Sequence, residues 1–197
     1  VRDALGWTRA IDYVLETYGD RSDFVFASHH WPTWGEENVA SLLTHQRDIY
    51  RYVHDQTLRA ANAGATMTEA AEAVEEPAFE SEADAFNTRG YYGTLNHNAK
   101  AVYQYYFGWW GGVPAEYNKL PHVVTAARYV NAMGGADATL ALGAKAFDAG
   151  DFRWAAEVFN HVVFADPENE TARNWLAAAY EQLGFQAESG AWRSYYL

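Results

Sequence analysis

The feature that most constrains the fold is a self-similarity with a period of 34 residues in the C-terminal third of the chain. Leu142, Ala144 and Gly150 recur as Leu176, Ala178 and Gly184. This is the period of tetratricopeptide (TPR) helical hairpins, in which a large and a small residue meet where the helices touch. We expect the glycine at the turn between the two helices of each hairpin. Because two hairpins are too few for a free-standing solenoid, they should dock on the preceding helices or on another subunit.

Helical patterns also fill most of the remaining chain. Thr66 and Glu69 form a capping-box pattern, and the helix that they open should run to Glu76, before Pro77. Residues 75–84 are acidic and poorly periodic, which predicts a solvated loop. Apolar residues spaced by three and four indicate further helices over residues 5–18, 39–58 and 99–107. From about residue 36 onward, the sequence therefore predicts only helices and turns.

One short segment near the N-terminus has the character of a strand. Residues 23–28 are aromatic and β-branched, and they end at His29 and His30, before Pro32. We predict one buried strand that delivers its end to a loop, followed by a turn over residues 31–35. A helix that leads into such a strand is typical of layered α/β folds, where ligands bind at strand ends. A single strand cannot make a sheet, so either its partners lie in a longer chain or this is not a strand.

Composition excludes several classes of function. The chain has 14 Lys and Arg against 26 Asp and Glu, a net charge of −12, which argues against nucleic-acid binding. Cysteine is absent, so disulfides and thiolate metal ligands are excluded. No apolar window is long enough for a transmembrane helix. The chain begins at Val1 without a signal-peptide pattern, which suggests a processed chain or a fragment.

The sharpest candidate for chemistry is the histidine pair at the end of the predicted strand. A neutral imidazole held there suits a zinc ligand, although a packed or surface histidine is the more common case. No H-x-H-x-D or H-E-x-x-H run accompanies His29 and His30, so further ligands would come from elsewhere. Arg2 is either an ordinary charge at the start of a helix or a guanidinium that holds a carboxylate, phosphate or sulfate through two N–H groups.

Three other motifs leave a structural and a functional interpretation open. His54-Asp55 is expected at a helix surface or contact, with a catalytic pair as the alternative. Residues 89–98 are dense in polar and aromatic groups, and they predict either loop packing or a contribution to a site or subunit contact. Trp109-Trp110 favours an interface or core over a stacking platform, because no basic groove accompanies it.

Six blocks, in order along the chain, resemble the linear alkyl sulfatases of the metallo-β-lactamase superfamily. They are FVFASHHWPTWG (24–35), QRDIY (46–50), HDQT (54–57), RGYYGTLNHN (89–98), AAEVFNHVVFADP (155–167) and QLGFQAESG (182–190). The resemblance implies a mainly α fold. Residues 36–197 would form a TPR-like dimerisation domain, and residues 1–35 a short α/β remnant of the hydrolase domain.

The resemblance also implies an activity and a partner. Alkyl sulfatases use two zinc ions to hydrolyse alkyl sulfate esters to alcohol and sulfate, and their helical domain pairs two subunits. The Tyr and Trp content suits such a homodimer. This chain lacks the family's H-x-H-x-D-H run, its acidic ligands and its C-terminal domain. Activity is therefore expected of the full-length protein and not of this segment alone, and bacterial members suggest a periplasmic or secreted location.

Individual residues can be assigned by the same resemblance. His29 resembles the last zinc ligand of the superfamily and is preferred over His30, which would be its neighbour. Arg2 resembles the arginine that clamps the substrate sulfate. The alternative to an alkyl sulfatase is a non-catalytic TPR-like interaction module, which the repeat and the missing ligand run would favour.

Overall fold

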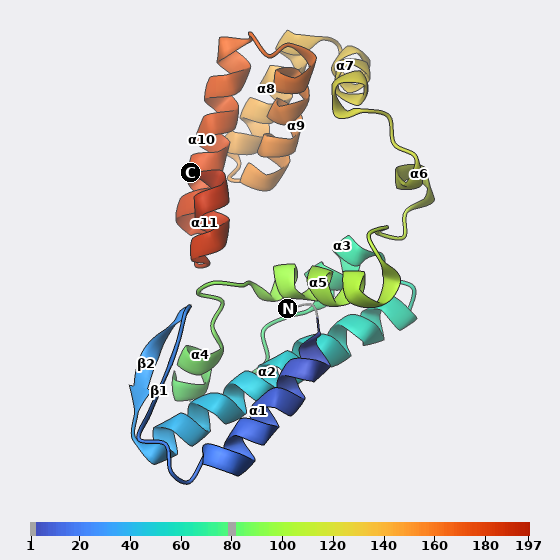
Figure 1. The fold of residues 1–197 in the computed structure, drawn as a ribbon. Coiled ribbons are helices and arrows are strands. Elements are labelled where there is room, and N and C mark those ends of the chain that lie inside the picture. The colour runs from blue at the N-terminus through green and yellow to red at the C-terminus, as the bar shows by residue number, and fades with distance from the viewer. Residues whose placement is uncertain (1–2, 79–81) are drawn as a thin grey trace. The chain divides into compact units, whose positions relative to one another are not determined.

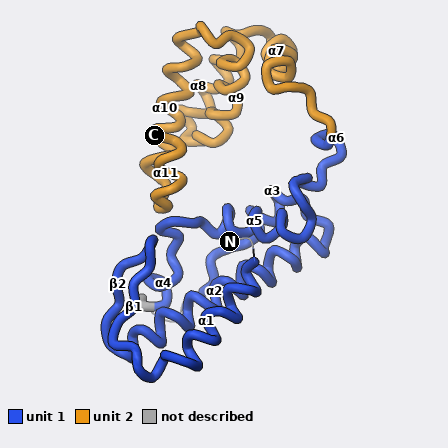
Figure 2. Tube along the Cα trace, in the orientation of Figure 1, with its two compact units in different colours: residues 1–117 blue, residues 118–197 orange. Residues whose placement is uncertain are grey.

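The computed structural model describes residues 3–78 and 82–197 (Figure 1). They form two compact units, Val1–Tyr117 and Asn118–Leu197 (Figure 2). Helices dominate both units, and the described residues contain one two-stranded sheet. The mainly α fold predicted from the sequence is confirmed. The domain boundary between residues 35 and 36 stays a prediction.

The first unit is organised around one long helix, α2 (Glu36–Asn62). Helix α1 (Ala4–Tyr18) packs along α2, as Figure 1 shows. Asp3 caps the start of α1, because its side chain accepts a hydrogen bond from the Gly6 amide at 2.7 Å. A guanidinium joins the two helices, because Arg47 on α2 pairs with Asp12 on α1 at 3.2 Å. Both helices agree with the predicted periodicity.

The segment between residues 66 and 107 follows the prediction only in part. The capping box is present at the start of α3 (Met67–Ala73), but this helix ends three residues before the predicted Glu76. The residue that follows the helix, Val74, has an extended backbone, and its side chain is buried in the core. Helix α4 (Glu82–Thr88) begins inside the predicted loop, and residues 79–81 lie outside the described residues. Two further helices complete the unit: α5 (Leu95–Phe107) and the four-residue α6 (Pro114–Tyr117).

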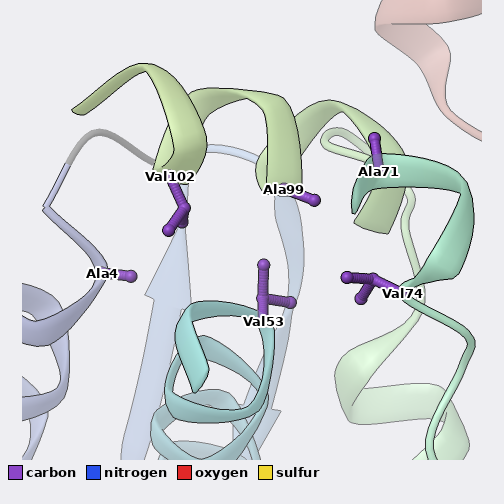
Figure 3. Close-up of a cluster of buried hydrophobic side chains, with 6 residues drawn as sticks. All are labelled: Ala4, Val53, Ala71, Val74, Ala99 and Val102. Atoms are coloured by element: carbon purple, nitrogen blue, oxygen red, sulfur yellow. The ribbon is translucent and has the colours of Figure 1, made fainter. Parts of the chain in front are cut away.

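Small apolar side chains form the core of the first unit. Figure 3 shows Val53 of α2 facing residues from the start of α1, from α3 and from α5. The cluster consists of Ala4, Val53, Ala71, Val74, Ala99 and Val102. The short side chains let the helices approach closely, and this fixes α3 and α5 on one end of α2.

The predicted buried strand is wrong in two respects. The strand β1 (Phe24–Ala27) pairs antiparallel with β2 (His30–Trp34), so its partner is local, and most of the turn predicted over residues 31–35 is itself strand. The side chains are mostly exposed, with Phe26 at 71%. The ladder pairs Val25 with Thr33 and then Ala27 with His30, so Pro32 lies at the register shift, and both strands of a two-stranded sheet are edge strands, where proline is tolerated.

The second unit contains five helices among the described residues and confirms the two predicted hairpins. These helices are α7 (His122–Ala132), α8 (Ala136–Asp148), α9 (Phe152–Ala165), α10 (Glu170–Gln186) and α11 (Gly190–Tyr196). Gly150 stands in the turn between α8 and α9 with φ = 79°, as expected. Gly184 does not mark a turn but lies within α10, where a Cβ atom would come within 2.7 Å of Leu197 Cγ. None of the described helices could cross a membrane.

Candidate functional site

The end of the β-hairpin meets the loop that precedes α5. The His29 ring lies flat against the Tyr92 ring, with centroids 3.6 Å apart and planes within 4°. The His30 ring meets Phe86 and Tyr91 edge-on, at centroid distances of 5.4 and 5.9 Å. The segment 89–98, singled out by its composition, therefore brings two tyrosines against the histidine pair.

The two histidines differ in how their ring nitrogens are engaged. The Nδ1 atom of His30 lies 3.2 Å from the Trp31 carbonyl oxygen, whereas its Nε2 atom is buried and has no hydrogen-bond partner. His29 is exposed at the turn between the strands. Within residues 3–78 and 82–197, no group of three or more His, Asp or Glu side chains could hold a metal ion. Arg2, the predicted sulfate ligand, lies outside the described residues.

An open cleft of about 830 Å³ lies beside the hairpin. It combines apolar surface from Trp34 and Phe86 with amide, hydroxyl and guanidinium groups. Its lining consists of Pro32, Thr33, Trp34, Asn38, Ser41, Ala85, Phe86, Asn87 and Arg89. Such a surface suits a partner or ligand with both polar and apolar parts.

A polar network behind this cleft holds α4 on α2. The His45 Nε2 atom lies 2.7 Å from Asp84 Oδ1, and the Asn87 Nδ2 atom lies 3.0 Å from His45 Nδ1. Gln46 donates a hydrogen bond to the backbone carbonyl of Asn87. Sequence reasoning missed this network, because His45, Asp84 and Asn87 are distant in sequence and form no recognisable motif.

The His54-Asp55 pair has a structural task. His54 is buried, with Nδ1 2.7 Å from Asp55 Oδ1 and Nε2 2.8 Å from the hydroxyl oxygen of Tyr106. Burial acts to raise the pKa of Asp55, but hydrogen bonds from His54 and Arg51 outweigh it and lower that pKa below its usual value. Since both ring nitrogens of His54 are engaged, one with its own helix and one with Tyr106, the pair clamps α5 onto α2.

The fold and the site define the class of protein: a mainly helical chain in which a short β-hairpin presents a histidine pair. The family described as alkyl sulfatase dimerisation matches residues 66–197, and the chain belongs to this family.

Sequence and structural relatives agree with this assignment over the whole chain. The chain is 53% identical to a linear primary-alkylsulfatase of a Pseudomonas species and 50% identical to an alkyl/aryl-sulfatase of Saccharomyces cerevisiae. It covers 29% and 30% of those proteins. The solved structure of a stereoselective inverting sec-alkylsulfatase from a Pseudomonas species superposes with a TM-score of 0.91 at 46% identity. All of this chain and 31% of that structure are covered.

Proposed function

We propose that this chain is the subunit-pairing part of an alkyl sulfatase, which hydrolyses alkyl sulfate esters to alcohol and sulfate. The observation that carries the proposal is the similarity of the entire chain to alkylsulfatases, at 53% and 50% identity. The chain spans about 30% of the length of those relatives, so catalysis belongs to a longer polypeptide of which this segment is one part.

The proposed organisation places residues 1–35 with the hydrolase domain and residues 36–197 in the dimerisation domain. The end of β2 at Trp34 and the start of α2 at Glu36 support a boundary there. The exposed aromatic side chains of the hairpin support contact with the remaining hydrolase domain, because large exposed apolar surfaces mark contact sites.

At the active site, this chain would contribute His29 as one zinc ligand and Arg2 as a sulfate contact. The position of His29 at a turn, with its ring braced by Tyr92, supports the first assignment. The unpartnered Nε2 atom of His30 supports keeping His30 as the competing ligand. Bound zinc would supply Lewis-acid activation of water. Arg2 would hold the sulfate through two N–H groups and would offset the net charge of −12.

Metal content and sulfate release by the full natural polypeptide test this function. We expect zinc on elemental analysis and alcohol release from dodecyl sulfate. His29→Ala should lower both zinc content and turnover, and Arg2→Ala should lower turnover while zinc content stays constant. His122→Gln, on helix α7 of the second unit, is the matched control and should change neither.

The outcomes separate the parts of the proposal. Zinc loss in His30→Ala but not in His29→Ala would transfer the ligand role to His30. A wild-type protein that contains no zinc and releases no alcohol would refute the alkyl sulfatase assignment as a whole, and a non-catalytic interaction module would then be the better description.

A further inference from the structure

The contact between His29 and Tyr92 joins two parts of the chain that have different proposed tasks. His29 belongs to residues 1–35, which we place with the hydrolase domain. Tyr92 lies inside residues 66–197, which match the dimerisation family. Both residues belong to the compact unit Val1–Tyr117, so the contact lies within one unit. A side chain of the helical part therefore touches the residue that we propose as a zinc ligand.

The geometry of the two rings leaves His29 able to bind a metal ion. The centroids are 3.6 Å apart and the planes are within 4°, so the Tyr92 ring covers one face of the imidazole. An imidazole nitrogen binds a metal ion through a lone pair that lies in the plane of the ring. Stacking on the face of the ring therefore fixes this plane, while the nitrogen edge of the exposed His29 stays accessible.

This stacking can take the place of a support that metal-binding histidines usually obtain from a hydrogen bond. Such histidines generally donate their second ring N–H to a carboxylate, a carbonyl oxygen or water, which fixes the orientation of the ring. In the part of the chain that the structure describes, the His29 side chain makes the ring contact with Tyr92 and no hydrogen bond. Tyr92 is therefore the described residue that can hold this imidazole in one orientation.

Tyr92 is itself held in a tight turn before α5. A Cβ atom at Gly90 would lie 3.0 Å from the Gly93 carbonyl oxygen, so the backbone folds closely on itself here. Directly after the turn, the Thr94 side chain caps α5 by accepting a hydrogen bond from the His97 amide at 3.0 Å. The start of a packed helix thus fixes the backbone from which the Tyr92 ring projects.

The neighbouring residue, Tyr91, anchors the same turn on the hairpin. Its ring meets the Trp31 ring edge-on with centroids 4.8 Å apart, and it meets the His30 ring at 5.9 Å. The two tyrosines therefore have different contacts: Tyr91 packs in the cluster around His30, whereas Tyr92 stacks on His29. Because of this difference, substitutions can separate the orientation of His29 from the docking of the hairpin as a whole.

We propose that Tyr92 is a positioning residue for His29, whose imidazole it holds in the orientation in which a ring nitrogen can bind zinc. This inference rests on the proposed alkyl sulfatase function and deepens it, because the helical part would then support the metal site directly. The role belongs to the flat ring of Tyr92 and not to its hydroxyl group, since the ring makes the contact with His29.

The zinc affinity of the full natural polypeptide, measured by competition with a chelator, tests this role. Tyr92→Leu removes the flat ring and should lower the zinc affinity about 10-fold or more, as is typical when a metal ligand loses its support. Tyr92→Phe keeps the ring and should retain the wild-type affinity. The matched control is Tyr13→Leu on α1, in the same unit, which should leave the affinity unchanged. Tyr13 is 62% exposed and Tyr92 is 54% exposed.

Recovery of turnover by added zinc separates a positioning role from a loss of folding. With limiting zinc, Tyr92→Leu should hydrolyse dodecyl sulfate more slowly than the wild-type protein, and excess zinc should restore its rate because His29 is still present. His29→Ala should not recover. Circular dichroism should show the same helix content in all variants.

A crystal structure of the zinc-loaded wild-type polypeptide covers the case in which Tyr92→Leu fails to fold. The rings of His29 and Tyr92 should remain stacked, with a His29 nitrogen about 2.0–2.1 Å from zinc. Rings that separate in the zinc-loaded protein would refute the positioning role without any variant.

The possible results are distinguishable. A wild-type protein that binds no zinc would refute the proposed function. A wild-type protein that binds zinc, together with an unchanged affinity in Tyr92→Leu or an equal loss in Tyr92→Leu and Tyr92→Phe, would refute only the role of the Tyr92 ring. An equal loss in Tyr91→Leu and Tyr92→Leu would also overturn that role, because the effect would then come from docking of the hairpin as a whole.

Discussion

The buried imidazole of His54 shows how a single residue joins two helices of this protein. Its two nitrogens are occupied by Asp55 on its own helix and by Tyr106 on α5, 52 positions away in the sequence. A buried polar atom that loses its partner retains the full cost of leaving water. The contribution of Tyr106 to stability should therefore depend on its hydroxyl group more than on its ring.

Tyr106→Phe tests that expectation. The substitution keeps the ring but leaves the Nε2 atom of His54 without a partner, and it should lower the free energy of unfolding by about 1–3 kcal/mol. Tyr105→Phe is the matched control, because this neighbouring side chain is 52% exposed and should change stability by less than about 0.5 kcal/mol. Urea unfolding followed by circular dichroism measures both. Equal effects of the two substitutions would contradict the clamp.

His161 provides a pH-dependent contribution in the second unit. Burial is the largest influence and lowers its pKa below the ordinary value of 6.5, with nearby Glu157 opposing and His122 reinforcing the shift. The unfolded chain therefore binds a proton at a higher pH than the folded chain does. The contribution of His161 is fully present above about pH 6.5 and is lost as the pH falls through the lower folded pKa.

We expect the wild-type protein to lose stability as the pH falls from about 7.5 to about 5, and His161→Gln to lose less over the same interval. Urea unfolding at several pH values in this window, with both proteins in parallel, gives the comparison. Parallel stability curves for wild type and variant would show that other groups cause the pH dependence.

At the scale of elements, two close helix contacts depend on glycine residues, which have no Cβ atom. Gly143 on α8 faces the fully buried ring of Phe159 on α9, and a Cβ atom at residue 143 would overlap that ring. A sequence repeat can mark such a position as small, but it cannot show which residue fills the space. The same holds for Gly184, which was expected in a turn and instead makes room for Leu197.

Gly143→Ala should therefore destabilise the second unit by about 1–3 kcal/mol, despite the higher helix propensity of alanine, because the core must shift to admit a methyl group. Gly111→Ala is the control. Its Cβ atom would lie 3.7 Å from the Met67 side chain, an ordinary contact, so the effect should stay within about 0.5 kcal/mol. Thermal unfolding of both variants provides the test. A stabilised Gly143→Ala protein would mean that α8 and α9 pack less tightly than described.

For the whole molecule, the property to test is the proposed pairing of two subunits. A protein that pairs through its folded state gains stability from mass action, so its melting temperature rises with concentration. Calorimetry at two well-separated concentrations of the full natural polypeptide should show this rise. A melting temperature independent of concentration in the wild-type protein would argue against pairing.

Helix positions were predictable from the sequence because the periodicity of apolar residues is a local property. The presence of α1, α2 and α5, the capping box at Thr66 and the two C-terminal hairpins followed from spacing, whereas α5 begins at Leu95, four residues before the predicted stretch. The early end of α3 was not predictable from the same signals. Burial of Val74 among residues from α1, α2 and α5 overrides the local preference, and this packing exists only in the folded chain.

Family membership was also contained in the sequence: six ordered blocks resemble one family, and the family match over residues 66–197 together with relatives that cover the whole chain confirms the assignment. The partners of each site residue were decided by tertiary structure. Strand β1 pairs with the strand that follows it directly. The ring of His29 stacks on Tyr92, and His54 is hydrogen-bonded to Tyr106. The physical reason is that periodicity reports which face of an element is apolar, whereas hydrogen bonds and ring contacts depend on distances between elements that only folding fixes.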